Sequence, residues 1–124
     1  MAGIDAPEIS RIEREPGQPY SQHAKRYLAG LILNKVVEIK GYGLDQNNRI
    51  LGVIYLNGKD INLEMVRAGL AEVYRGKSPG GLNLNPFWHA QEEARLLKRG
   101  MWIQGENYVS PKEWREMHKG DLDQ

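Results

Sequence analysis

The sequence contains no cysteine and no long apolar run. The first absence excludes disulfide bonds, thiolate metal sites and cysteine catalysis, and it leaves the redox compartment open. The second means that no segment approaches the ~20 apolar residues that cross a membrane as a helix, and no signal peptide is visible. A G-x-S-x-G elbow is also missing, which argues against a serine hydrolase.

The chain also carries little net charge. Its 17 basic and 16 acidic side chains leave a formal net charge of +1. A protein with so little net charge has no strong overall field, so a local site would have to hold any polyanionic ligand. With 124 residues, 40% of them hydrophobic, the chain has the size and composition of one globular domain with a core of its own.

The apolar pattern of the first half predicts a helix followed by a pair of strands. Apolar residues at helical spacing predict a helix over 21–33, with Ser21 as its N-cap. β-Branched residues predict a strand over 36–42, and the turn-rich residues 45–48 connect it to a returning strand over 49–55. Asn57-Gly58 then predicts a tight turn. Two strands are too few for a stable sheet, so further strands are expected.

The second half is predicted to be mainly helical. Asn62 is expected to cap a short helix over 63–68 with Gly69 in its C′ position, and an extended piece follows at 70–74. Asn85 is expected to be the N-cap of a long helix, with Pro86 at its first helical position and Gly100 at its end. The sequence Ser-Pro-Lys-Glu at 110–113 is a capping box for a final helical turn. The predicted fold class is therefore α+β.

Two carboxylates stand close together near the start, in Gly3-Ile4-Asp5-Ala6-Pro7-Glu8. Pro7 fixes its own φ and biases the residue before it away from helix, so this stretch is predicted to be an extended or turning loop, with Ile4 as a buried anchor. Asp5 and Glu8 on such a loop suit metal binding or general-base catalysis. The alternative is a solvated turn with two ordinary surface acids.

Other titratable and aromatic residues give weaker signals. The three histidines show no metal-ligand spacing. Tyr74, Arg75 and Lys77 could line a substrate groove, with the ring stacking on a base and the cations meeting phosphate. They could equally belong to a solvent-exposed loop, and the sequence leaves these two interpretations open.

A set of short motifs, in a fixed order, resembles the staphylococcal (micrococcal) nuclease family. The motifs are Gly3-Ile4-Asp5-Ala6-Pro7-Glu8, Gln18-Pro19-Tyr20, Asp45…Arg49, Asn57-Gly58…Asn62-Leu63…Val66, Gly69-Leu70-Ala71-Glu72-Val73-Tyr74, and Ala90…Glu93-Ala94…Gly100-Met101-Trp102. Each motif alone is weak, and their order and separations over residues 3–102 make the resemblance specific.

The resemblance implies a five-stranded OB-fold-type β-barrel with helices, and a hydrolase activity. The implied enzyme is a Ca²⁺-dependent thermonuclease, an endonuclease that cleaves single-stranded or frayed DNA and RNA and leaves 3′-phosphates. By motif, Asp5 matches a carboxylate ligand of the calcium, and Ala6 matches a neighbouring ligand that acts through its backbone carbonyl. Glu8 matches the general base, and Arg49 matches an arginine that grips the phosphate.

The sequence also departs from the family pattern. The family places three strands before the acidic loop, with another calcium-binding aspartate and a second phosphate-binding arginine, and this sequence starts too late to contain them. The tyrosine-glycine pair before the strand arginine is here Asn47-Asn48. The expected architecture is one domain over 1–124 with a C-terminal extension over roughly 103–124, and a barrel that is incomplete or completed by another chain.

Three explanations of the missing strands remain open from sequence: a piece of a longer protein, a strand-swapped homo-oligomer, or a degenerate nuclease that keeps only a binding surface. Besides the nuclease, the candidate functions are a non-catalytic OB-type module that binds nucleic acid or protein, and a scaffold domain. The resemblance is compatible with a secreted or cell-envelope protein. The sequence by itself does not choose between DNA and RNA.

Overall fold

The structure is a computed structural model, and it describes residues 1–9 and 17–118. Its elements are β1 (Ile4–Asp5), α1 (Ser21–Ile32), β2 (Glu38–Leu44), β3 (Ile50–Leu56), β4 (Lys59–Asp60), α2 (Ile61–Arg67), β5 (Glu72–Val73), α3 (Asn85–Leu96), a 3₁₀ segment η1 (Gly100–Asn107) and α4 (Pro111–Met117). The predicted α+β class is confirmed. In the described ranges no helix is long and apolar enough to cross a membrane. The last residues of the expected extension, 119–124, lie outside the description.

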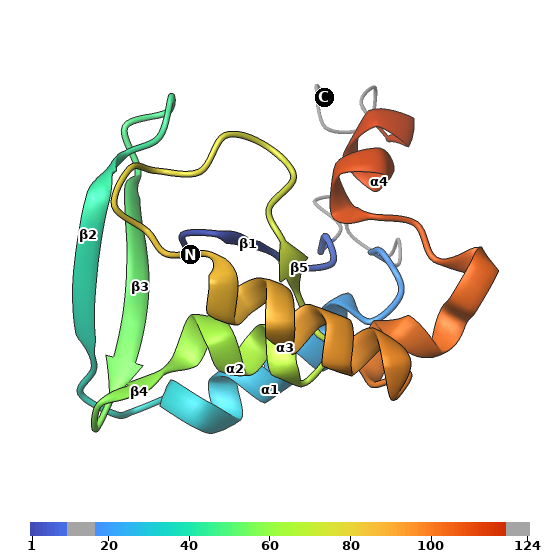
Figure 1. Cartoon of the computed structure of the whole chain (residues 1–124), viewed down its shortest axis with the longest axis horizontal. Coiled ribbons are helices and arrows are strands. Elements are labelled where there is room, and N and C mark those ends of the chain that lie inside the picture. The colour runs from blue at the N-terminus through green and yellow to red at the C-terminus, as the bar shows by residue number, and fades with distance from the viewer. Residues whose placement is uncertain (10–16, 119–124) are drawn as a thin grey trace.

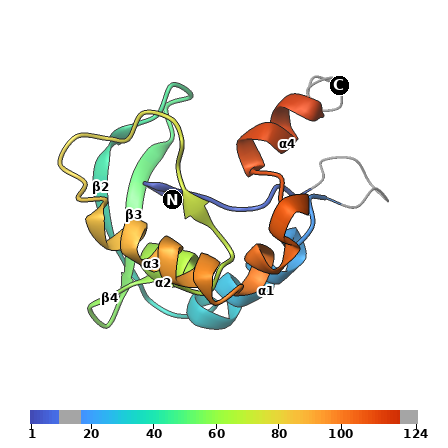
Figure 2. The same cartoon turned by 45° about the vertical axis from the view of Figure 1, so that its right-hand side comes forward.

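The described strands form two separate sheets. One is the antiparallel sheet β2-β3-β4, and the other pairs β1 with β5. Figure 1 shows the β2–β3 hairpin on one side of the molecule, helices α1, α2 and α3 along its base, and α4 on the other side. The same arrangement is visible after rotation in Figure 2. The described strands are not closed into a barrel, so the expected barrel is not confirmed, and β2 lies at a sheet edge.

The hydrophobic core lies where α2, α3 and the β1–β5 pair meet. Its buried members are Ile4, Ala24, Met65, Val66, Leu70, Ala71, Val73, Phe87 and Ala90. Val66 and Ala71 are fully enclosed, and burial of such apolar surface is the main favourable term in folding. Ile4 packs into this core as the sequence predicted, so the strand that carries the acidic loop is anchored to the body of the domain.

The predicted N-caps of α1 and α2 are both wrong. Ser21 is not the N-cap of α1, because Tyr20 takes that place in a left-handed conformation (φ 72°) and Ser21 is the first helical residue. Asn62 does not cap α2 either. Asp60 does so, with its side chain accepting from the backbone N–H of Leu63 at 2.8 Å. A carboxylate at this position offers the orphan N–H a stronger acceptor than an amide.

The buried side chain of Asn62 has a different use. Its Nδ2 donates to the carbonyls of Ala2 (3.0 Å) and Gly52 (3.1 Å), and its Oδ1 accepts from the N–H of Ile54 (3.1 Å). The N–H of Ala2 also donates to the carbonyl of Gly52 at 2.7 Å. These bonds fix the residues that lead into β1 against β3, and they therefore set the starting point of the acidic loop.

The later helices begin close to the predicted residues. Helix α3 starts at Asn85 with Leu84 as an N-cap that gives no side-chain hydrogen bond, so Asn85 is not the cap. The predicted capping box before α4 is confirmed, because Ser110 Oγ accepts from the N–H of Glu113 at 3.1 Å. The same hydroxyl donates to the carboxylate of Glu113 at 2.9 Å. The sequence therefore determined where α4 begins.

Gly69 ends α2 in the predicted C′ position, with φ +74°. A Cβ here would stand 2.2 Å from the carbonyl oxygen of Arg99, and the carbonyl of Gly69 accepts from the N–H of Met101 at 2.9 Å. Only glycine permits both the left-handed turn and this backbone approach. The contact ties the end of α2 to the start of η1, and from there the chain leads on to α4.

Candidate active site

Asp5 is positioned by the pairing of β1 with β5. Ile4 pairs with Val73 and Asp5 with Glu72, and the carbonyl of Gly3 accepts from the N–H of Tyr74 at 2.9 Å. Successive side chains of a strand point to opposite faces, so the burial of Ile4 in the core turns Asp5 to the other face. The Asp5 side chain is 11% exposed, which is little for a carboxylate.

Glu8 is held through hydrogen bonds to Gln18. The N–H of Glu8 donates to Gln18 Oε1 at 3.0 Å, and the N–H of Gln18 donates to the carbonyl of Glu8 at 2.7 Å. The other end of the buried Gln18 amide donates to the carbonyl of Val109 at 2.6 Å. One side chain thus joins the acidic loop to the segment before α4, and Glu8 has a fixed backbone position.

The two carboxylates converge on one guanidinium, that of Arg115 on α4. Arg115 Nη1 and Nη2 donate to Asp5 Oδ1 and Oδ2, both at 2.9 Å, and Nη1 lies 2.5 Å from Glu8 Oε1. The bonds to Asp5 raise the pKa of Arg115 above its ordinary value, with a smaller contribution from Glu8. The structure therefore brings Asp5 and Glu8 together around a single positive charge.

A third carboxylate, Glu72, lies on the strand beside Asp5. It is 2% exposed, and burial raises its pKa although Tyr108 and Arg75 act in the opposite direction. Tyr108 Oη donates to Glu72 Oε2 at 2.8 Å, and Arg75 Nε lies 3.0 Å from Glu72 Oε1. Burial next to this carboxylate raises the pKa of the Tyr108 hydroxyl. Because Arg75 and Tyr108 face Glu72, they offset the repulsion between two carboxylates that are directly opposite across the strand pair.

Arg49 lies in the turn that joins β2 to β3 and is 73% exposed. Its Nε lies 2.9 Å from Asp45 Oδ2, and its backbone N–H donates to Asp45 Oδ1 at 3.0 Å. That backbone bond is the main reason why the pKa of Asp45 is lowered. Among the described residues no hydrogen bond or ion pair joins Arg49 to Asp5 or Glu8, and Figures 1 and 2 show this turn and α4 on different sides of β1. Its phosphate-gripping role stays a prediction.

The three candidate substrate contacts follow β5. Tyr74 is 39% exposed, and Lys77 is exposed. Arg75 is half exposed and is shared between Glu72 and Glu113, whose Oε1 lies 3.4 Å from Arg75 Nη1. Tyr74 and Arg75 therefore adjoin the acidic strand, whereas no contact here defines the use of Lys77. The groove and the loop interpretations both remain predictions.

The donor set at the acidic loop suits a hard cation in type but is small in number. Within residues 1–9 and 17–118, no group of three histidine, aspartate or glutamate residues is placed to hold a metal ion. Asp5 and Glu8 supply two carboxylates that already converge on a cationic group, and Ala6 supplies a backbone carbonyl. Ca²⁺ takes six to eight oxygen ligands, so water or substrate oxygens would have to complete the shell.

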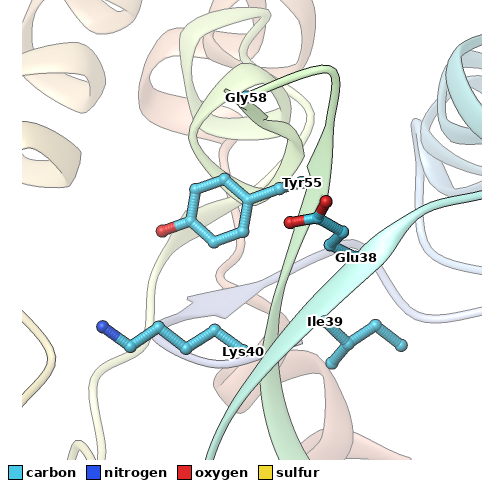
Figure 3. Close-up of a pocket in the computed structure, with 5 residues that line it drawn as sticks. All are labelled: Glu38, Ile39, Lys40, Tyr55 and Gly58. Atoms are coloured by element: carbon cyan, nitrogen blue, oxygen red, sulfur yellow. The ribbon is translucent and has the colours of Figure 1, made fainter.

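An open depression of about 400 Å³ lies elsewhere, on the β2–β3 hairpin. It is lined by Glu38, Ile39, Lys40, Tyr55 and Gly58. Figure 3 shows Lys40 and Ile39 extending to opposite sides of β2. None of its lining residues belongs to the acidic loop or to α4. We therefore take the convergent carboxylates, rather than this depression, as the candidate site.

Sequence reasoning missed two residues of this site. Gln18 belongs to the motif Gln18-Pro19-Tyr20, but nothing in the local sequence shows that its amide connects Glu8 with Val109. Arg115 lies 110 residues from Asp5, on a helix whose start was predicted but whose packing was not. Arg115 is the arginine of a helix whose start the capping box predicts, and this is the signal that the sequence offers for it. The position of Arg115 on that helix does not identify a partner as distant as Asp5.

A protein family and several individual proteins resemble this chain over most of its length. A family profile described as "Staphylococcal nuclease homologue" matches residues 1–104. A "Probable endonuclease LCL3" of Debaryomyces hansenii is 36% identical over 128 residues, which covers 98% of this chain and 54% of that protein. Proteins of the same name from Candida albicans and Paracoccidioides lutzii are 34% and 35% identical, covering 95% and 97% of this chain and 52% and 38% of theirs. The chain thus spans about half the length of the first relatives.

Proposed function

The chain belongs to the family of staphylococcal nuclease homologues, and on that premise we propose that it is a Ca²⁺-dependent endonuclease that hydrolyses phosphodiester bonds of DNA or RNA. The observation that carries the proposal is the convergence of Asp5 and Glu8 on one cationic group. Single-stranded nucleic acid is the proposed substrate and 3′-phosphates are the proposed products. Because the chain spans about half the length of the first relatives, the activity of the whole protein is part of the proposal.

The proposed metal ligands are the Asp5 carboxylate and the Ala6 carbonyl. Both are hard oxygen donors, as Ca²⁺ requires, and the low exposure of Asp5 favours a partner of positive charge. When bound, the cation would neutralise phosphate charge and polarise a water molecule. Asp5 is held by the β1–β5 pairing and by the anchored Ile4, so its oxygens are fixed before any ligand arrives.

Glu8 is the proposed general base. It accepts a proton from a water whose oxygen attacks phosphorus, while the bond from phosphorus to the 5′-oxygen breaks and that oxygen takes a proton from solvent. This leaves a 3′-phosphate and a 5′-hydroxyl. The hydrogen bonds between Glu8 and Gln18 support the assignment, because a general base must be held within reach of its proton donor. Arg49 would have to leave Asp45 to grip the phosphate, and Tyr74, Arg75 and Lys77 are the proposed substrate contacts.

The position of β2 at the edge of its sheet, among the described strands, supports a proposal about how the sheet is extended. Val36 is 94% exposed and Ile39 is 62% exposed, so apolar side chains of this region face solvent. Exposed strand edges invite pairing with another chain. If two copies of β2 paired antiparallel about Ile39, Glu38 of each would stand opposite Lys40 of the other. We therefore propose that an OB-type sheet is completed by a second copy, as a strand-paired homo-oligomer.

A nuclease assay with and without EGTA tests the proposed enzyme. We expect Ca²⁺-dependent cleavage of single-stranded DNA that falls at least ~100-fold in Glu8→Gln and in Arg49→Ala. Glu106→Gln is the matched control, since it makes the same chemical change at an exposed position outside the site. Cleavage that survives EGTA would refute the calcium requirement. Unchanged turnover in Glu8→Gln or Arg49→Ala would remove that residue from the mechanism.

A catalytically degenerate OB-type module that binds nucleic acid or protein is the second candidate. It is favoured by one observation: Arg115 already neutralises much of the charge of the acidic pair. Binding of labelled single-stranded DNA, measured by fluorescence anisotropy, separates the two functions. Binding without cleavage at any Ca²⁺ concentration supports the module, and absence of both supports a scaffold domain.

A further inference from the structure

The geometry points to Arg115 as the residue that contacts the substrate phosphate at the acidic loop. This inference rests on the proposed function. It also adds a residue outside the family match, which ends at residue 104. Arg115 touches both carboxylates, and a phosphate bridged to a cation on Asp5 would lie within reach of the same guanidinium.

The charge balance of the site favours this role over a purely structural ion pair. Asp5 and Glu8 contribute two negative charges and Arg115 one positive charge, so this group carries a net charge of −1. A divalent cation would change that charge to +1, which one phosphodiester neutralises. Without Arg115, the cation alone would neutralise the carboxylates, and each phosphodiester would add an uncompensated negative charge. Arg115 thus makes the loaded site complementary to a phosphodiester.

The donor geometry is also suitable. A planar guanidinium matches two oxygens of a phosphate as well as it matches two oxygens of a carboxylate. In the structure both Nη atoms of Arg115 donate to Asp5. The Arg115 side chain is 32% exposed, so solvent and ligands reach it. If a cation took over the charge of Asp5, the guanidinium would be available to a phosphate. Arg75 pairs with Glu72 and Glu113, whereas Arg115 is the described cation that pairs with Asp5 and Glu8.

The competing interpretation is that Arg115 holds the site in an inactive state by occupying both carboxylates. In that case α4 would block cation binding, and removal of the guanidinium would raise both cation affinity and nucleic-acid affinity. Substrate contact predicts a different combination. Loss of Arg115 would raise the affinity for Ca²⁺, because a positive charge is removed, but it would lower the affinity for a polynucleotide.

The experiment measures these two affinities on the full chain. Ca²⁺ binding is followed by calorimetry, and a fluorescein-labelled phosphorothioate oligothymidine, which resists cleavage, is titrated in saturating Ca²⁺. The variants are Arg115→Ala and Arg115→Lys, with Lys112→Ala as the matched control. Lys112 is an exposed cation on the same helix, so its loss changes the net charge equally. Tryptophan fluorescence, to which Trp114 on α4 contributes, and circular dichroism report whether α4 stays docked.

For Arg115→Ala we expect Ca²⁺ affinity to rise by about tenfold, as the Coulomb interaction over a few ångström in a water-like dielectric indicates. Oligonucleotide affinity should fall by at least about tenfold, the usual size of a lost charge-assisted hydrogen bond. Arg115→Lys keeps the charge but loses the fork, so its Ca²⁺ affinity should stay near wild type and its oligonucleotide affinity should fall in part. Lys112→Ala should stay within about twofold of wild type in both measurements, since a surface charge has a small effect.

Other outcomes overturn the inference in distinguishable ways. Unchanged oligonucleotide affinity in Arg115→Ala, with a wild type that binds both ligands, overturns the inference and leaves the proposed function standing. A rise in both affinities shows that Arg115 blocks the site instead of binding substrate. A fall in both affinities with an altered fluorescence signal identifies a residue that only holds α4. A wild type that binds neither Ca²⁺ nor oligonucleotide removes the proposed function, and the inference with it.

Discussion

Replacing Asn62 with alanine tests how the fold sets the position of the acidic loop. Asn62 is completely buried and makes three hydrogen bonds: its Nδ2 donates to the carbonyls of Ala2 and Gly52, and its Oδ1 accepts from the N–H of Ile54. The alanine variant leaves all three backbone groups without that partner. Because Ala2 leads directly into β1, loss of these bonds should also loosen the strand that carries Asp5.

The magnitude follows from the number of groups left without a partner. A buried polar group without a partner costs about 1–3 kcal/mol, and the carbonyl of Gly52 keeps a second bond from the N–H of Ala2. Two groups at full cost and one at reduced cost give a loss of about 2–7 kcal/mol in the free energy of unfolding, if a water molecule does not refill the space. This is a large part of the roughly 5–15 kcal/mol that stabilises a typical domain.

Urea unfolding followed by tryptophan fluorescence measures this loss. Asn107→Ala, an exposed asparagine near the end of η1, is the matched control and should change stability by less than about 0.5 kcal/mol. Asn62→Asp should be at least as damaging as Asn62→Ala, because a carboxylate cannot donate to two carbonyls and buries a charge. A loss below about 1 kcal/mol in Asn62→Ala would refute the assignment of Asn62 as the bridge between β1 and β3.

Two further predictions concern Glu72 and the edge strand. Burial raises the pKa of Glu72, so the folded protein binds this proton more tightly than the unfolded chain. Near pH 4 the carboxyl is largely protonated in both states and its burial costs no ionisation energy. Above the raised pKa the folded protein carries the full destabilisation of a buried carboxylate. The stability of Glu72→Gln relative to wild type should therefore increase as pH rises from about 4 to 8 in urea titrations, and a constant or shrinking difference would contradict this. At the β2 edge, Ile39→Lys should abolish self-association measured by analytical ultracentrifugation. Leu96→Lys, at an exposed position on α3, should leave self-association unchanged. If wild type and Ile39→Lys sediment with the same molecular mass, β2 does not pair with a second copy.

Local sequence signals predicted many elements because their cause is local. The left-handed turn at Gly69, the turn at Asn57-Gly58 and the capping box at Ser110 depend on residues within a few positions of each other. Cap identity was predicted less well. Asn62 and Asp60 are both good N-cap residues, and the choice between them depends on which side chain is needed elsewhere.

The short strands were visible only in part: β5 lies within the extended piece predicted at 70–74, whereas β1 and β4 were not predicted as strands. β1 and β5 have two residues each, and their strand character comes from pairing with each other rather than from a hydrophobic period. β4 is also two residues long and exists because the Asn57-Gly58 turn returns the chain onto β3. A pattern needs several repeats before it can be recognised, and these segments are shorter than that.

The sequence by itself determined the helices, the main hairpin, the proline-stiffened loop with Asp5 and Glu8, and the family, because each of these depends on residue type and spacing along the chain. The tertiary structure alone decided what faces the two carboxylates. Arg115 and Gln18 reach them from remote segments, and Arg49 is paired with Asp45 instead. The physical reason is that charge pairing acts through space, and the packing of α4 against the acidic loop is set by contacts that no local spacing records.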